Sequence, residues 1–149
     1  MLTLLLLATT LLVQEPAAPL ELNAAEKQFQ EMLANVTMEG YFTVGDGAET
    51  RPDRYIIERV TKIKDDVWRF EARVLYNGKD FKAAVPVPVK WAGDVPVLTL
   101  SNYSIPGQGI FSARILMYNG MYAGTWGAQS HGGKMFGKIV KNTTTEERR

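Results

Sequence analysis

The chain has 149 residues, of which 46% are hydrophobic and 22% charged, and it contains no cysteine. This length and composition are typical of one folded domain with a core of its own. The lack of cysteine excludes a disulfide scaffold and a cysteine-ligated zinc or iron–sulfur site. The formal net charge is only +1, so we expect no nucleic-acid partner, because such partners require a strong basic excess.

Residues 1–18 are predicted to form a signal peptide. Residues 2–13 read LTLLLLATTLLV, an apolar run that is too short for a membrane-spanning helix and suits a signal-peptide core. Residues 14–16 end the run, and Ala17-Ala18 supply small residues for cleavage. We therefore expect a secreted or periplasmic protein with no integral membrane span after removal of the signal. A buried N-terminal helix is the alternative.

One helix is predicted over residues 24–34. Asn23 followed by Glu26 indicates a capping box at its start. Apolar residues then recur at helical spacing; they are Leu22, Ala25, Phe29, Met32, Leu33 and Val36. We expect this helix to pack on a sheet or to close one end of a barrel.

After Val36 the apolar period changes from 3.6 to 2, which predicts strands. The expected strands are 36–44, 53–64, 67–76, 80–91, 95–102, 110–118, 121–127 and 134–141. Asn77-Gly78 and Asn119-Gly120 predict tight hairpins, because both central residues of a type I′ turn need positive φ. Short sequential hairpins form a meander, and about eight strands hide their edges best by closing into an up-and-down barrel.

The predicted domain therefore covers residues 19–141, mainly β with one N-terminal helix, and residues 142–149 form a flexible polar tail. Pro86 and Pro88 have the same parity in the fourth strand. Because proline lacks an N–H, the two residues remove ladder hydrogen bonds on one side of that strand only. We expect either a gap, bulge or open edge beside them, or a short kink in an otherwise closed barrel.

The order of one helix followed by an eight-strand meander resembles the calycin group, which includes the lipocalins and avidins. Gly124-Thr125-Trp126 also resembles the Gly-x-Trp signature of the lipocalins. The resemblance covers the topology of about residues 36–141 and implies a small β-barrel with room for a small apolar ligand. The motif lies on the seventh strand here, so no binding residue is carried over from the family.

The residues offer little for catalysis or metal binding. His131 is the only histidine, the acidic residues lack calcium-loop spacing, and no Gly-x-Ser-x-Gly elbow or phosphate loop is present. Ser130 precedes His131, but a catalytic triad also needs an orienting acid within hydrogen-bond reach. We expect no metal, no cofactor and no enzymatic activity, with an exported hydrolase as a remaining alternative.

The aromatic residues are the candidates for ligand binding. They concentrate on the third, fourth and seventh predicted strands, where they either fill a core or form a ligand box. Residues 122–137 contain five glycines, which suit a tight barrel corner or a binding mouth near His131. The candidate ligand residues are Trp68, Phe70, Trp91, Tyr122, Trp126 and His131.

Two functions remain open from the sequence. The first is an exported barrel that binds a small apolar or amphipathic ligand. The second is a filled-core structural or interaction module without a ligand, which contacts an unknown protein partner through its Pro-interrupted strand or its N-terminal helix. The size of an internal cavity separates the two, because a ligand site needs a mostly apolar hollow.

Overall fold

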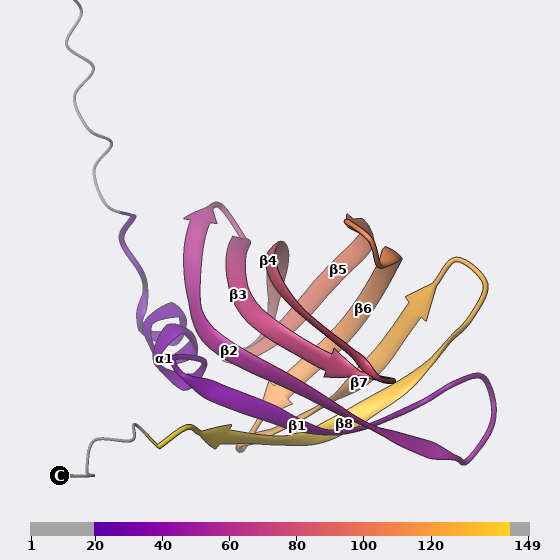
Figure 1. The fold of residues 1–149 in the computed structure, drawn as a ribbon. Coiled ribbons are helices and arrows are strands. Elements are labelled where there is room, and N and C mark those ends of the chain that lie inside the picture. Colours follow the sequence, from indigo (N-terminus) through magenta and orange to yellow (C-terminus); the bar gives the residue numbers. More distant parts are fainter. Residues whose placement is uncertain (1–19, 144–149) are drawn as a thin grey trace, which may run out of the picture.

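The computed structural model describes residues 20–143, so the predicted signal peptide and most of the predicted tail lie outside the described residues. The described part is mainly β, with one short helix followed by eight strands (Figure 1). The elements are α1 Ala24–Met32, β1 Val36–Thr43, β2 Thr50–Lys64, β3 Val67–Tyr76, β4 Lys79–Ala92, β5 Val95–Ile105, β6 Gly109–Tyr118, β7 Met121–Ala128 and β8 Gly132–Lys141.

The eight strands form one closed antiparallel barrel in sequence order, as the hairpin pattern predicted. β1 closes the barrel by pairing with β8, from Val36 opposite Lys141 to Phe42 opposite Met135. Closure leaves no free edge at this seam between the first and last strands. The N-terminal part of the domain is thereby joined to its last strand.

The two predicted Asn-Gly turns are present. Asn77 and Gly78 have φ of 48° and 75°, and Asn119 and Gly120 have φ of 52° and 71°, as a type I′ turn requires. Some boundaries differ from the prediction. β2 begins three residues early, at Thr50, and β5 continues to Ile105 through an irregularity between Leu100 and Tyr103. The prediction placed a loop there because it could not anticipate a bulge.

The two prolines coincide with a split in the barrel wall. β4 pairs with β3 over Lys79–Pro88, and it pairs with β5 only over Val89–Ala92. Pro86 and Pro88 lie just before this short ladder and cannot donate to β5. The hydroxyl of Thr99 donates to the carbonyl oxygen of Pro88 at 3.0 Å and ties the two strands where the ladder stops. The barrel is therefore closed, with a local gap on one side of β4, which was one of the two expected outcomes; the structure shows that this side faces β5.

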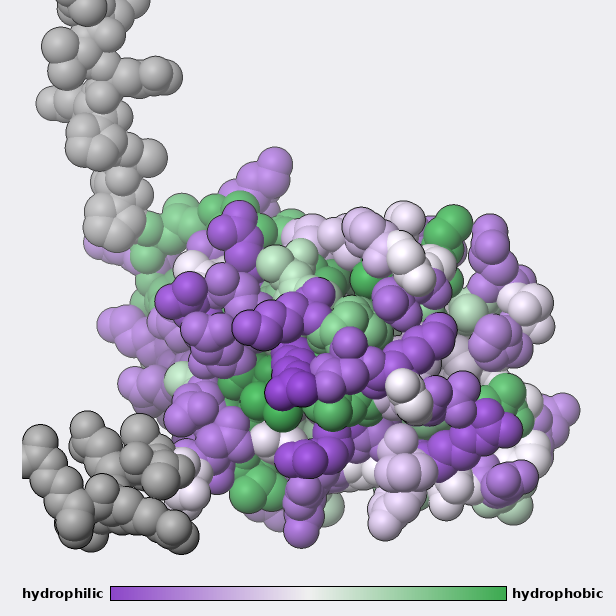
Figure 2. All heavy atoms as spheres, in the orientation of Figure 1, coloured by the Kyte–Doolittle hydropathy of each residue, from purple (hydrophilic) through white to green (hydrophobic). Residues whose placement is uncertain are grey.

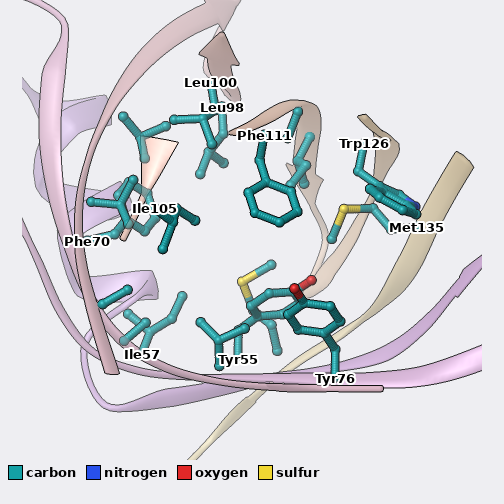
Figure 3. Close-up of a pocket in the computed structure, with 18 of the residues that line it drawn as sticks. Tyr55, Ile57, Phe70, Tyr76, Leu98, Leu100, Ile105, Phe111, Trp126 and Met135 are labelled. Atoms are coloured by element: carbon teal, nitrogen blue, oxygen red, sulfur yellow. The ribbon is translucent and has the colours of Figure 1, made fainter. Parts of the chain in front are cut away.

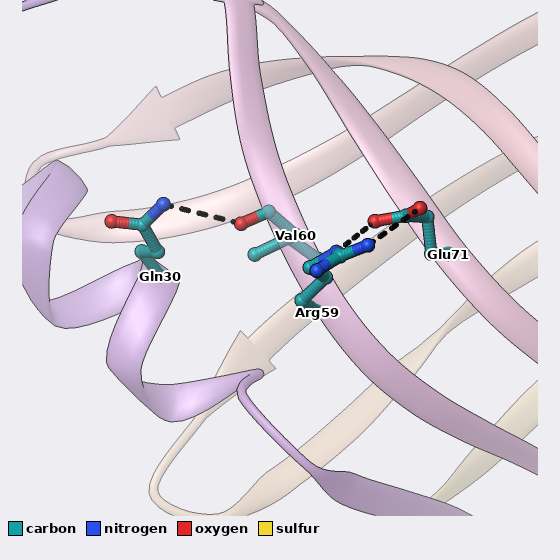
Figure 4. Close-up of polar contacts among 4 residues, drawn as sticks. All are labelled: Gln30, Arg59, Val60 and Glu71. Atoms are coloured by element: carbon teal, nitrogen blue, oxygen red, sulfur yellow. Dashed lines mark hydrogen bonds and ion pairs between the residues drawn. The ribbon is translucent and has the colours of Figure 1, made fainter.

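The helix α1 lies at one end of the barrel, against β2 (Figure 1). Its predicted capping box is present, with the Asn23 side chain accepting from the Glu26 N–H at 2.9 Å. The Gln30 side chain donates to the Val60 carbonyl of β2 at 3.3 Å (Figure 4). The Lys141 ammonium donates to the Glu31 carbonyl at 2.6 Å, near the negative end of the helix dipole. These bonds fix the helix as the base of the barrel.

A half-buried ion pair also joins the helix to the wall. The Lys62 ammonium lies 2.6 Å from a carboxylate oxygen of Glu26, and the two side chains are 15% and 11% exposed. Burial acts to raise the pKa of Glu26, but the Lys62 pair and the hydrogen bond with Asn23 outweigh it, and the pKa is lowered. The carboxylate is therefore charged at neutral pH.

The outer surface carries the charged side chains of the strands. Arg59 pairs with Glu71 across β2 and β3 (Figure 4), and Arg73 pairs with Asp80 at 2.6 Å. This places them on the solvated face, as the alternation of the third strand predicted. In Figure 2 polar residues dominate the visible face and apolar ones form small groups among them.

Candidate functional site

The barrel interior has two unequal parts. At the helix end, side chains fill the space. Phe29 of α1 packs edge-to-face on Trp68 with ring centroids 4.9 Å apart, and on Trp91 at 5.8 Å. Leu33 and Val60 are fully buried beside them. This end is a packed core with the helix as its plug.

The other part of the interior holds a cavity of about 220 Å³ (Figure 3). All eight strands contribute to its wall, and none of the lining residues is charged. Examples are Phe42, Phe70, Leu98, Phe111, Trp126 and Met135. The volume exceeds that of an apolar cavity of about 150 Å³ that is known to bind benzene. The hollow can therefore hold a small apolar molecule.

Aromatic rings gather where the cavity approaches the end opposite α1. Trp126 and Phe42 meet edge-to-face with centroids 5.8 Å apart, and Phe42 meets Tyr76 at 6.2 Å. Tyr76 in turn meets Phe81 at 6.2 Å. The Trp126 ring is fixed because its Nε1–H donates to the Thr43 carbonyl at 3.0 Å. We call Trp126, Phe42, Tyr76 and Phe81 the aromatic rim.

A buried carboxylate lies in the wall behind the cavity. Asp53 is 2% exposed and accepts hydrogen bonds from the hydroxyls of Tyr122, at 3.0 Å, and Tyr55, at 3.2 Å. Burial raises the pKa of Asp53, and the two tyrosine hydrogen bonds only partly offset that effect. Tyr55 lines the cavity, whereas Asp53 and Tyr122 do not. The cluster therefore meets the cavity through Tyr55.

Two glycines make room for this cluster. Tyr122 is opposite Gly137, Gly137 is opposite Gly40, and Gly40 is opposite Asp53 in four neighbouring strands. A Cβ on either glycine would lie 2.7 Å from the Tyr122 hydroxyl oxygen, and closer still to backbone atoms. The phenol can reach across two strands to Asp53 only because both positions lack a side chain.

The six predicted ligand residues fall in different surroundings. Phe70 and Trp126 line the cavity. Trp68 and Trp91 belong to the packed helix end, where both contact Phe29. Tyr122 is 1% exposed and binds Asp53. Ligand binding by these residues stays a prediction, and the sequence analysis did not single out Tyr55, Asp53, Phe42 or Phe111.

His131 lies outside the cavity wall, on the exposed β7–β8 loop beside the aromatic rim. Its ring meets Trp126 edge-to-face at 5.4 Å, and its Nδ1 is 3.1 Å from the Ser130 hydroxyl oxygen. Among the described residues no carboxylate is hydrogen-bonded to His131, so the Ser130–His131 pair lacks the orienting acid of a triad. The Gly-rich segment around it contributes to the loop and to the close contacts of β8.

Residues 20–143 contain no group of three or more His, Asp or Glu side chains placed to hold a metal ion. Over the same residues no helix is long and apolar enough to cross a membrane. The cavity, its aromatic rim and the Asp53–Tyr55 pair make up the candidate site.

Comparison of the chain with protein-family models, curated proteins and solved structures found no match. The eight-stranded closed barrel agrees with a calycin-like barrel at the level of the fold. Fold alone does not assign a function, so the function has to be argued from the cavity.

Proposed function

We propose that this protein binds a small apolar or amphipathic molecule inside its barrel and is not an enzyme. The cavity of about 220 Å³, with an uncharged and mainly apolar wall, is the observation that carries the proposal. Apolar hollows of this kind gain free energy when a ligand replaces empty space or poorly bound water. The packed helix end and the aromatic rim suit a rigid wall around such a ligand.

The proposal includes export of the protein to the periplasm or the cell exterior, with residues 1–18 acting as a signal peptide. A binding protein in such a compartment would protect or carry a molecule of low water solubility. The calycin-like identity suggested by the fold belongs to the same proposal. The alternative is a filled-core interaction module, for which the cavity would have no role.

Native mass spectrometry of the chain from residue 19, purified from an exporting host, tests the proposal. We expect an adduct that survives gentle transfer and disappears on denaturation. Calorimetric titration with an apolar probe such as indole gives a second readout. A protein that carries no adduct and binds no apolar probe would contradict the proposal and favour the interaction module.

Two alanine positions provide a matched pair of variants. Ala113 lines the cavity, whereas Ala123 is exposed on the outer face of the neighbouring strand β7. Ala113→Leu places three additional carbon atoms in the hollow and should weaken probe binding by about tenfold or more. Ala123→Leu should leave binding unchanged. Equal affinities for the two variants would place the ligand elsewhere.

A further inference from the structure

Tyr55 and Tyr76 both line the cavity (Figure 3), and of their two hydroxyls the one of Tyr55 has its hydrogen-bonding role set by the protein. The Tyr55 hydroxyl donates its only proton to Asp53, so its oxygen can face a ligand only as an acceptor. The carboxylate behind it increases the negative charge on that oxygen. The Tyr122 hydroxyl donates a hydrogen bond to the other carboxylate oxygen of Asp53 at 3.0 Å, which fixes the Asp53 side chain in place. The pair is therefore an acceptor built into an apolar wall.

The proton on Tyr55 is firmly held. Burial raises the pKa of Tyr55 well above its usual range, and the nearby charge of Asp53 raises it further. The phenol therefore keeps its proton at neutral pH, and that proton remains directed at Asp53.

Two other donors in the wall, on Trp126 and Ser112, are used within the protein. The Trp126 Nε1–H is bonded to a backbone carbonyl of β1. The Ser112 hydroxyl donates to the Asn102 side chain at 3.3 Å and accepts from the Asn102 N–H at 2.9 Å. Tyr76 is the exception, because its hydroxyl has no hydrogen bond within the described part of the chain. Figure 3 shows how few oxygen and nitrogen atoms interrupt the carbon wall.

The lack of charged residues in the cavity wall also disfavours anionic ligands. No Lys, Arg or His lines the cavity, so a bound anion would lose its water without gaining a cation. The carboxylate of Asp53, which is hydrogen-bonded to Tyr55, would repel it. A ligand hydroxyl or amine would instead donate to the Tyr55 oxygen and have its polar group satisfied.

We propose that the cavity selects apolar molecules that end in a hydrogen-bond donor, an alcohol or an amine, and excludes carboxylates. Tyr55 accepts the ligand's hydrogen bond, and Asp53 is the positioning residue that holds the Tyr55 hydroxyl. This inference rests on the proposed binding function and specifies the chemical class of its ligand.

Three probes with similar alkyl chains test the inference by calorimetric titration of the chain from residue 19. 1-Octanol donates a hydrogen bond, its isomer heptyl methyl ether only accepts, and octanoate is an anion. We expect octanol to bind about tenfold more tightly than the ether and octanoate to bind more weakly than either. Tyr55→Phe should reduce the affinity for octanol to that for the ether. The control variant Tyr118→Phe, on the exposed outer face, should keep the preference for octanol.

The outcomes separate this inference from the proposed function. Octanoate binding as tightly as octanol, or a preference for octanol that survives Tyr55→Phe, would overturn the inference while leaving ligand binding intact. If none of the probes binds, both proposals fail. Should Tyr55→Phe not fold, the ζ-carbon NMR signal of Tyr55 in the wild-type protein decides, because it should shift with octanol and not with the ether. Equal shifts would overturn the inference.

Discussion

Truncation of Phe29 is the most direct test of how α1 closes one end of the barrel. The Phe29 ring is 2% exposed and meets Trp68 and Trp91 edge-to-face, and Phe70 at 6.2 Å. Phe→Ala substitutions in a core cost about 3–5 kcal/mol, and each edge-to-face aromatic pair contributes about 0.5–1.5 kcal/mol. We expect Phe29→Ala to lower the free energy of unfolding by about 4 kcal/mol, with a fall in Tm of roughly 10 °C.

Urea denaturation followed by tryptophan fluorescence measures this loss, since two of the tryptophans contact the removed ring. Tyr118→Ala serves as the control, because Tyr118 is 64% exposed on the outer face and its truncation should cost about 0.5 kcal/mol or less. A loss below about 1 kcal/mol for Phe29→Ala would show that the helix does not close the barrel as described. The void left by the ring adjoins Phe70, so the variant should also accept bulkier apolar probes.

Three further changes test the ion pair, the buried carboxylate and the split. Glu26→Gln and Lys62→Met should each lower the free energy of unfolding by about 1–3 kcal/mol and the double variant by less than their sum; additive losses in urea denaturation would show that the pair does not interact. Because burial raises the pKa of Asp53 above its ordinary 3.8, the folded chain holds a proton that the unfolded chain has already lost. As pH rises from the ordinary pKa of aspartate to the raised pKa of Asp53, the free energy of unfolding of the wild type should therefore fall relative to that of Asp53→Asn, and above this range the difference should stay constant. A difference that does not depend on pH, measured in parallel denaturation series, would refute this. Pro88→Val restores an N–H facing β5 and should slow amide exchange of Thr99, whereas unchanged exchange would mean that the proline does not cause the split.

Most of the fold could be predicted from the alternation of apolar and polar residues and from the residues at the turns. The inward set of β3, from Trp68 to Tyr76, and the two Asn-Gly turns followed directly from period and φ requirements. The shared parity of Pro86 and Pro88 predicted that one side of β4 would pair poorly, and the structure shows that this side faces β5. Closure was expected only because a barrel hides its strand edges, and a partly open barrel remained an alternative, because the pairing of β1 with β8 depends on the twist of all eight strands together.

The site was harder to predict because parity tells which face a residue occupies and not how deep it lies along the barrel. Trp68 and Phe70 share one face of β3, yet only Phe70 reaches the cavity, because α1 fills the space beside Trp68. The partnership of Tyr122 with Asp53 depends on a register across four strands. Asp53 shares the parity of Tyr55 in β2, and that signal could have indicated an inward carboxylate.

A crystal of the chain from residue 19 under xenon pressure tests the central claim most directly. Xenon occupies dry apolar cavities and leaves packed cores empty. We expect anomalous density for xenon within the hollow bounded by Phe70, Leu98 and Trp126, and none beside Phe29. If no xenon binds inside the barrel and side chains fill that hollow, the ligand-binding account is contradicted.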